Sequence, residues 1–299
     1  MEKVNKIPGA LMDWIIKTLN SGVNPEAIVD AMIRKGYDPK LSYTTLFRIV
    51  GNKPINTPGV QAPYEYEQPE IAKKGSVLHT SDREIKVLSK VEKPFILHLD
   101  HFLSYEECDQ LIEMSRSRLM PSTVIDPKTG EEKAATGRTS KGMYFYLREN
   151  EFIKKVENRI AELTEFPLEN GEGLQVLNYG IGEEYKSHFD YFPPSKVDPD
   201  KGGQRVGTFL IYLNDVPAGG ETVFPKAGVS IVPKKGSAVY FQYGNSKGEV
   251  DRMSLHSSIP VSEGEKWVAT KWIRQGNIYP ALTGSKPLLT QSLSEHEEI

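Results

Sequence analysis

The chain has 299 residues, of which 38% are hydrophobic and 26% charged, and its formal net charge is −3. This length and composition are typical of a soluble globular protein with one large domain, or with a large and a small one. No apolar run reaches the roughly 18 residues that a membrane helix needs, and a mildly acidic chain is a poor binder of nucleic-acid phosphates. We therefore expect no membrane span and no nucleic-acid partner.

The N-terminal segment and the cysteine content indicate a cytoplasmic protein. In MEKVNKIPGALMDWII, Asp13 interrupts a short apolar stretch and no small-residue cleavage site follows, so the segment does not look like a signal peptide. The single cysteine, Cys108, excludes an internal disulfide and a cysteine-rich zinc module. Both features fit a reducing compartment.

Residues 1–50 are predicted to form a small helical module. Apolar residues recur at helical spacing in two stretches, the dipeptide Asn24-Pro25 is typical of a helix start, and Gly36 stands where a helix end is expected. A third short helix is expected over residues 43–50. The apolar faces of these helices could bind a protein partner, or could serve only as the core of the module.

Prolines divide this module from the rest of the chain. Four prolines between residues 51 and 76 favour an extended linker, because proline blocks both helices and central strands. The main domain is expected over residues 77–278, followed by a polar tail at 279–299.

The main domain is predicted to open with a strand at residues 94–99, followed by two helices. Ser104 and Glu107 have the spacing of a capping box, which marks the start of the first helix. Apolar residues on one face indicate the second helix at 149–164. After Gly173 come short apolar segments broken by glycine and proline, which are typical of the strands of a β-sandwich or barrel. We expect a mostly β domain with the two helices packed outside.

Two of these segments carry candidate metal ligands. Residues two apart in a strand point the same way, so His188 and Asp190 could bind one ion together. His256, on a later strand, is the candidate third ligand, since the other histidines lie near the first strand or in loose regions. Two imidazoles and one carboxylate are typical of non-haem Fe(II) sites. A zinc hydrolase could use the same ligands, so these residues alone do not choose the metal.

Lys266 begins the apolar segment KWVATKWI. A lysine in this position is usually a solvated charge at a sheet edge. If it instead points into the domain, it needs an anionic partner, because a lone buried ammonium is costly. A dicarboxylate co-substrate would supply that partner, and the hydroxyl groups of Thr222 and Tyr179 could donate to the same carboxylate.

Residues 94–274 resemble the prolyl 4-hydroxylase family of 2-oxoglutarate- and Fe(II)-dependent dioxygenases, in a bacterial or phage-type version. The matching segments are GRTSKGMYF, LQVLNYGIGEEYKSHFDYF, GGQRVGTFLIYLND, GGETVFP and LHSSIPVSEGEKWVATKWI. The resemblance implies a double-stranded β-helix, or jelly roll. It also implies site residues: iron ligands at His188, Asp190 and His256; 2-oxoglutarate contacts at Lys266, Tyr179 and Thr222; and positions near the substrate at Tyr185, Arg205 and Trp272.

The same resemblance implies the reaction. Fe(2+), 2-oxoglutarate and O2 would serve to hydroxylate prolyl residues of a peptide or protein, at C4, while 2-oxoglutarate is decarboxylated to succinate and CO2. L-ascorbate is expected as a further cofactor. Two alternatives stay open: a hydroxylase of a free amino acid or other small metabolite, and a non-catalytic binding module that has kept the metal site.

Two polar loops are expected beside the site. Residues 120–142 could be a plain solvent loop, but the resemblance implies a mobile loop that folds over bound peptide. Arg138, near its end, is expected to anchor the loop rather than to take part in chemistry. Residues 193–203 are expected to lie at the mouth of the barrel.

Overall fold

The computed structural model describes residues 8–21, 23, 25–38, 41–42, 45–46, 49, 64–125, 132–134 and 137–279. The chain divides into two compact units, residues 1–64 and 65–299. Residues 65–76, which the sequence analysis placed in the linker, belong to the second unit, and Ile71 is buried in its core. The rest of the predicted linker before residue 64, and the tail after residue 279, lie outside the described residues.

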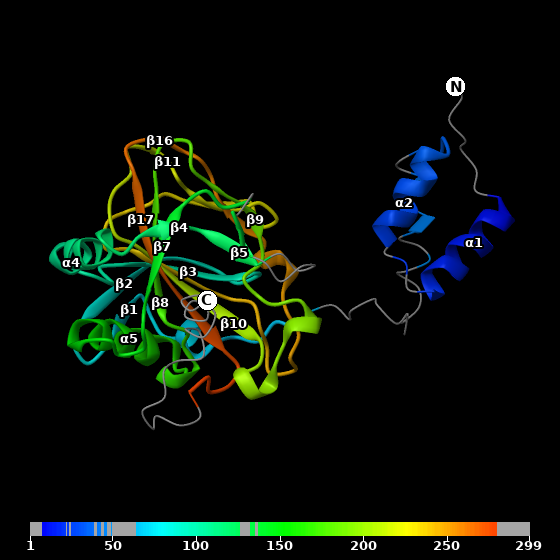
Figure 1. The fold of residues 1–299 in the computed structure, drawn as a ribbon. Coiled ribbons are helices and arrows are strands. Elements are labelled where there is room, and N and C mark those ends of the chain that lie inside the picture. The colour runs from blue at the N-terminus through cyan, green and yellow to red at the C-terminus, as the bar shows by residue number, and fades with distance from the viewer. Residues whose placement is uncertain are drawn as a thin grey trace, which may run out of the picture. The chain divides into compact units, whose positions relative to one another are not determined.

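The first unit contains helices α1 (Gly9–Asn20) and α2 (Pro25–Arg34) (Figure 1). Its buried apolar side chains form a cluster of their own, made of Ile15, Leu19, Ile28, Val29, Met32 and Leu46. Gly36 ends the second helix with a φ of 90°, a backbone conformation that glycine adopts readily. Residues 41, 42, 45, 46 and 49 are helical, whereas the other positions of the predicted third helix lie outside the described residues.

The second unit is built on a nine-stranded antiparallel sheet (Figure 1). Its strands, in spatial order, are β1 (Val77–His79), β2 (Glu84–Val91), β3 (Phe95–Asp100), β14 (Ala238–Gln242), β10 (Arg205–Tyr212), β17 (Lys266–Arg274), β8 (Leu174–Tyr179), β7 (Lys141–Phe145) and β4 (Met120–Pro121). A four-stranded sheet packs against it, in the order β13 (Val229–Ile231), β12 (Thr222–Phe224), β15 (His256–Ser258) and β9 (Tyr185–His188).

Short elements complete this unit. Two strand pairs, β11 (Ala218–Gly219) with β16 (Val261–Glu263) and β5 (Thr123–Ile125) with β6 (Glu132–Ala134), stand apart from the main sheets. The 3-10 helices are η1 (Glu70–Lys73), η2 (Leu168–Asn170), η3 (Pro194–Lys196), η4 (Pro199–Lys201) and η5 (Arg252–Ser254). The predicted loop at 120–142 thus contains β5 and β6, and the loop at 193–203 contains η3 and η4.

Strand periodicity sends alternate side chains to two different cores. Between the two sheets lie side chains such as Tyr212 and Phe241 of the large sheet and Phe224 of the small one. The opposite face of the large sheet is covered by helices α4 (Tyr105–Arg116) and α5 (Glu151–Thr164). Together these layers are the mostly β architecture with outer helices that the sequence predicted.

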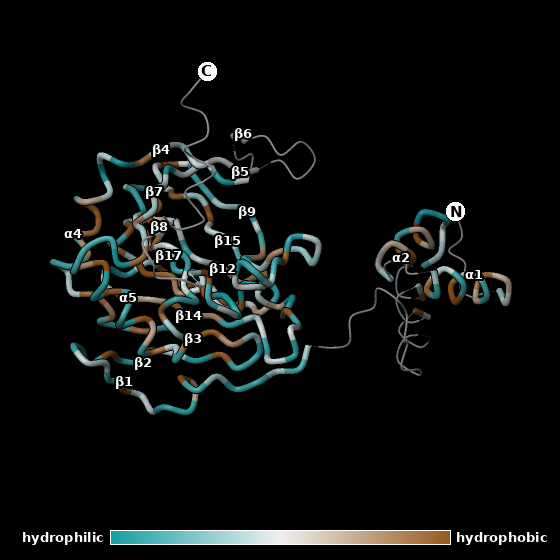
Figure 2. The backbone as a smooth tube through the Cα atoms, turned by 60° about the horizontal axis from the view of Figure 1, so that its bottom comes forward, coloured by the Kyte–Doolittle hydropathy of each residue, from teal (hydrophilic) through white to brown (hydrophobic). Residues whose placement is uncertain are grey.

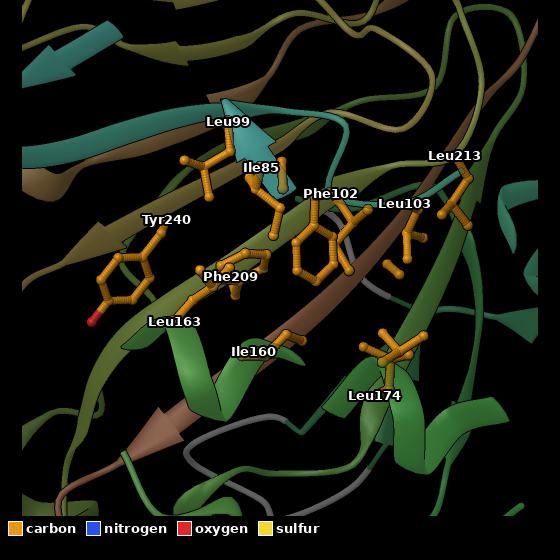
Figure 3. Close-up of a cluster of buried hydrophobic side chains, with 14 of the residues drawn as sticks. Ile85, Leu99, Phe102, Leu103, Ile160, Leu163, Leu174, Phe209, Leu213 and Tyr240 are labelled. Atoms are coloured by element: carbon orange, nitrogen blue, oxygen red, sulfur yellow. The ribbon is translucent and has the colours of Figure 1, made fainter. Parts of the chain in front are cut away.

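The first outer helix begins where its capping box predicts, and the second begins two residues later than predicted. Ser104 and Glu107 form the expected capping box at the start of α4, and α5 begins at Glu151 with Asn150 as its cap. Along α5, hydrophobic residues alternate with hydrophilic ones (Figure 2). Figure 3 shows its Ile160 and Leu163 facing Phe209 of β10. No helix of the described part of the chain is long and apolar enough to cross a membrane.

The buried Arg159 links α5 to α4 and to Asp82, which lies between β1 and β2. Arg159 of α5 is fully buried and pairs through two nitrogens with the Asp82 carboxylate, at 3.0 and 2.6 Å, and through two with Glu107 of α4, at 3.0 and 2.9 Å. It also donates to the carbonyl of Phe102 at 2.6 Å. These hydrogen bonds use every N–H donor of the guanidinium.

Replacing Arg159 with leucine is expected to lower the free energy of unfolding by about 3 kcal/mol, because Asp82 and Glu107 lose their buried partner and keep only the more exposed Lys155 and Arg83. Urea-induced unfolding measures the change. Lys154→Ala, on the same helix, removes an exposed ion pair with Glu151 and is expected to have little effect. Equal losses in the two variants would contradict the role assigned to Arg159.

Candidate metal centre

Two histidines from neighbouring strands and one aspartate form the candidate metal centre. His188 is the last residue of β9, His256 is the first of β15, and the two pair directly across the strands. Asp190 lies two residues beyond the end of β9. One ligand atom from each of the three lies within 4.8 Å of the others. The prediction that His188 and Asp190 share one strand was wrong, because the strand ends at His188, but the bend that follows still brings the carboxylate to the histidines.

The backbone fixes which ring nitrogen faces the centre. His188 Nδ1 lies 2.8 Å from the carbonyl of Lys186, and His256 Nδ1 lies 3.0 Å from that of Ser254. A carbonyl can only accept, so each Nδ1 is the donor in these bonds and each Nε2 is the ring nitrogen left to face the centre. The Nε2 atoms of His188 and His256 lie 3.4 and 3.6 Å from the Asp190 oxygens. The three groups thus present free donor atoms to one point.

Their protonation states also suit a metal. Burial alone would raise the pKa of Asp190, but the facing His256 and His188 rings and the hydroxyl of Thr208 hold that pKa well below its ordinary value. Burial lowers the pKa of His256 to about 4, although Asp190 opposes this shift. At neutral pH the centre therefore offers a carboxylate and a neutral imidazole at these two positions, as metal ligation requires. Two imidazoles and one carboxylate fit Fe(II).

A chain of hydroxyl groups holds the carboxylate from behind. Thr208 of β10 donates to Asp190 Oδ2 at 2.6 Å, and its own oxygen lies 3.0 Å from the hydroxyl of Tyr243. Since the single Thr208 proton is given to the carboxylate, Tyr243 is the donor in the second bond. This arrangement engages one oxygen of Asp190 and leaves Oδ1 open toward the centre.

Thr208→Val is therefore expected to weaken metal binding about tenfold, since loss of a partner behind a metal ligand commonly costs about 10–100-fold in affinity. Titration of the metal-free protein with Mn²⁺ measures this. Thr208→Ser keeps the hydroxyl and is expected to keep most of the affinity. A valine variant with unchanged affinity would show that Asp190 needs no such support.

The second part of the site is a buried cation. Lys266, the first residue of β17, is 1% exposed and points between the sheets rather than to solvent. Its Nζ donates to the hydroxyl of Ser258 at 2.7 Å and lies 5.5 Å from the ring centre of Tyr179, its partner across the strands. Burial lowers the pKa of Lys266 to about 7, with Glu221 opposing the shift. An anion bound here would restore the full charge of the ammonium.

Thr222 lines the same cavity as this cation, and its hydroxyl proton is available for a hydrogen bond. The hydroxyl of Tyr212 donates to Thr222 Oγ1 at 2.7 Å, so the proton of Thr222 remains free for an acceptor. One cavity joins this end to the histidines. Its lining residues include Tyr179, Thr222, Ser258 and Lys266 at the cation, His188, Asp190 and His256 at the candidate metal centre, and Arg138, Gln175, Tyr185, Thr270 and Trp272.

The three residues expected near the substrate have different surroundings. Tyr185 stacks on the ring of His188, with 3.5 Å between ring centres, and Trp272 lines the cavity. Arg205 is not among the lining residues. Its guanidinium pairs with the buried Glu172 at 2.7 and 2.6 Å, donates to the backbone carbonyl of Asp190 at 3.2 Å and lies over the Trp272 ring. Arg205 therefore braces the site from outside the cavity.

The sequence analysis missed several of these residues. Ser258 stands two positions after His256, and Thr208 and Tyr212 alternate along one strand with Phe209 and Ile211, which face the core under the helices, so strand periodicity would have placed them on the other face of the sheet. No pattern in the sequence pointed to Glu172, because its partners Arg205 and Arg274 lie far along the chain.

A jelly roll with this ligand set and a buried lysine defines the class of 2-oxoglutarate- and Fe(II)-dependent oxygenases. In agreement, residues 174–274 match the model of the 2OG-Fe(II) oxygenase superfamily. The chain is 40% identical over 210 residues to the probable prolyl 4-hydroxylase 8 of Arabidopsis thaliana, covering 64% of this chain and 71% of that protein. It is 44% identical over 197 residues to prolyl 4-hydroxylase 1 of the same plant, covering 61% and 69%.

A solved structure agrees with these sequence matches. The viral collagen prolyl hydroxylase of Paramecium Bursaria Chlorella virus-1, in complex with 2-oxoglutarate, is 30% identical, with a TM-score of 0.50, over 60% of this chain and 95% of that one. The chain belongs to the prolyl 4-hydroxylase family. This confirms the predicted enzyme class and jelly-roll fold, with Fe(2+) as cofactor and 2-oxoglutarate and O2 as co-substrates. Ascorbate stays a prediction.

Proposed function

We propose that this enzyme hydroxylates prolyl residues of a peptide or protein, at C4, while 2-oxoglutarate is decarboxylated to succinate and CO2. The observation that supports it best is the buried Lys266, placed in one cavity with His188, Asp190 and His256, in a chain of the prolyl 4-hydroxylase family. That cavity offers a cation for a dicarboxylate and three metal ligands beside it.

We assign separate roles to the residues that line the cavity. We assign His188, Asp190 and His256 as the iron ligands and Lys266 as the partner of the distal carboxylate of 2-oxoglutarate. Thr222 can donate its free proton to the same carboxylate, and Tyr179 completes this end. The bound iron would supply the activation of dioxygen that the protein's own side chains cannot perform. The protein holds the co-substrate, orients it and keeps water away from it.

The opposite end of the cavity would receive the substrate. The buried Nε1 of Trp272 and Oε1 of Gln175 have no hydrogen-bond partner within the described part of the chain. A donor and an acceptor of this kind match the carbonyl and amide of a peptide backbone. We assign Trp272 and Tyr185 to the substrate side, with Arg205 holding the Trp272 ring through its stacking contact.

The predicted lid belongs to the same proposal. The C-terminal end of the 120–142 segment is held beside β9. Arg138 forms an isolated antiparallel β-bridge with Tyr185, and the Thr139 amide donates to the carbonyl of Glu184 at 3.1 Å. The lid itself stays a proposal from the family resemblance, that this segment folds over a bound peptide beside Tyr185, because residues 126–131 and 135–136 lie outside the described part of the chain. This anchoring agrees with the role expected for Arg138.

The 299-residue chain, loaded with Fe²⁺ and given 2-oxoglutarate, should add one oxygen atom to a proline-rich peptide and form succinate in equal amount. Mass spectrometry of the peptide and a succinate assay measure both products. Free proline is the matched comparison. Succinate formation and oxygen incorporation with free proline, but not with any peptide, would reject the peptide substrate and favour the small-metabolite alternative.

A further inference from the structure

The loop between β14 and β15, which contains η5, supports two of the three candidate ligands. We call residues 243–254, the stretch from Tyr243 to Ser254, the support loop. At its start, the Tyr243 hydroxyl bonds to Thr208, which in turn holds Asp190. At its end, the Ser254 carbonyl accepts from His256 Nδ1. The amide of Asp251 donates to the Tyr243 carbonyl at 2.7 Å, so the two ends are tied together.

Asp251 sets the direction of the Ser254 carbonyl. This aspartate is 2% exposed and caps η5, with its Oδ1 accepting from the Met253 amide at 2.8 Å. Its backbone carbonyl accepts from the hydroxyl of Ser254 at 2.7 Å. The ring of His256 is therefore oriented through a turn that Asp251 holds.

A segment far away in the sequence holds this loop. We call residues 65–67 the strap. The Glu65 amide donates to Glu249 at 3.1 Å, and Glu67 accepts from the amide of Ser246 at 2.8 Å. Between them lies Tyr66, whose pKa is raised to about 12, mainly by burial and further by the charge of Asp251. The strap thus contacts the support loop with three successive residues.

Asn245 joins strap and loop. Its Nδ2 donates to the Glu65 carbonyl at 3.0 Å and to Glu249 at 2.7 Å, and its Oδ1 accepts from the amides of Lys247 and Glu249 at 3.1 and 2.9 Å. All four hydrogen-bonding positions of this amide are used, and the residue is 6% exposed. The amide side chain therefore fixes the loop and the strap in one arrangement.

We propose that the strap belongs to the support of the metal centre, with Tyr66 and Asn245 acting as positioning residues for His256 and Asp190. The proposal rests on the metal site of the proposed function. Residues 65–67 hold the support loop, the loop holds the Ser254 carbonyl and the Tyr243 hydroxyl, and these orient the two ligands. The segment directly after the N-terminal unit thereby sets metal affinity, rather than serving as a spacer.

The test is a Co²⁺ titration of the metal-free 299-residue chain, without 2-oxoglutarate or peptide, followed through the visible absorption of bound Co²⁺. Asn245→Asp removes the donor to the Glu65 carbonyl and faces Glu249 with a second negative charge. It is expected to weaken Co²⁺ binding about tenfold and to change the absorption spectrum, because partners behind the ligands commonly contribute about 10–100-fold. Tyr66→Phe is expected to weaken binding in the same direction, by a smaller factor.

The matched control is Glu70→Gln, in the same segment, whose side chain pairs with the exposed Lys73 and not with the support loop. It is expected to bind Co²⁺ as the parent does. Parent-like affinity and spectrum in Tyr66→Phe and in a folded Asn245→Asp would overturn the proposal, and Tyr66→Phe alone decides if the other variant does not fold. A parent chain that binds no Co²⁺ would instead contradict the metal site of the proposed function.

Discussion

Asp190→Ala is expected to abolish metal binding and turnover together. Asp190 is the carboxylate of the cluster, and its loss leaves the two imidazoles, His188 and His256, without an anionic partner at the centre. We expect the affinity for Fe²⁺ or Mn²⁺ to fall by more than about 100-fold, because even a lost partner behind a ligand commonly costs about 10–100-fold. Metal titration and succinate formation at saturating 2-oxoglutarate measure the two effects.

The same variant should still fold without metal. Asp190 is 8% exposed, and the groups that hold its pKa below the ordinary value also stabilise the folded, metal-free protein at neutral pH, so removing the carboxylate removes a favourable interaction. Its thermal unfolding midpoint without metal should therefore lie at or below that of the parent, while the rise on adding Mn²⁺ disappears. Asp200→Ala, at an exposed carboxylate in η4, is the control and should keep both binding and activity. Full turnover by Asp190→Ala would remove this residue from the ligand set.

The ligand types were predictable from the sequence, but their arrangement was only partly so. The two-residue spacing led us to expect His188 and Asp190 side by side, and they do lie together, but strand periodicity is not the reason, because Asp190 lies past the end of the strand. The direct pairing of His188 with His256 depends on the register of β9 against β15. Register is fixed by contacts that lie far apart in the chain, so one sequence does not reveal it.

Elements with local causes were predicted best. The capping box at Ser104 and the apolar face of α5 depend on residues three or four apart, and both occur where expected. The segment at 65–76 was taken for part of a spacer because of the four prolines between residues 51 and 76. Its contacts with Ser246 and Asn245 are tertiary, about 180 residues away, and local composition carries no sign of them.

Arg205 shows the same limit at the site. The sequence indicated an arginine near the substrate, and the structure places it behind the Trp272 ring. What directs it there is Glu172, a buried carboxylate that also pairs with Arg274. A buried ion-pair network can be recognised only once the fold has brought its members together.

Lys266→Met is expected to raise the Kd for 2-oxoglutarate by about 30-fold or more. Truncating one partner of a buried charged pair costs about 2 kcal/mol or more, and 1.4 kcal/mol corresponds to about tenfold in affinity. Methionine keeps most of the side-chain volume, so the strand and the Tyr179 ring should stay in place. Calorimetric titration of the Mn²⁺-loaded protein measures the change.

The control is a co-substrate without the second carboxylate. In the parent, 2-oxopentanoate should bind far more weakly than 2-oxoglutarate, although it has the same chain length and the same oxo acid group. In Lys266→Met the two compounds should bind with similar affinity. If the variant still preferred the dicarboxylate by the parent's ratio, another cation would have to hold the distal carboxylate.

The pH dependence of this binding gives an independent check. The pKa of Lys266 is lowered to about 7 by burial in the ligand-free protein, so the ammonium is lost as pH rises above that value. A bound dicarboxylate favours the charged form and raises this pKa, and binding above pH 7 must therefore take up a proton. The affinity of the parent for 2-oxoglutarate should be level below pH 7 and should fall above it by up to about tenfold per pH unit. Lys266→Met should lose this fall, and a parent whose affinity stayed flat from pH 6 to 9 would show that Lys266 is already fully charged before the anion arrives.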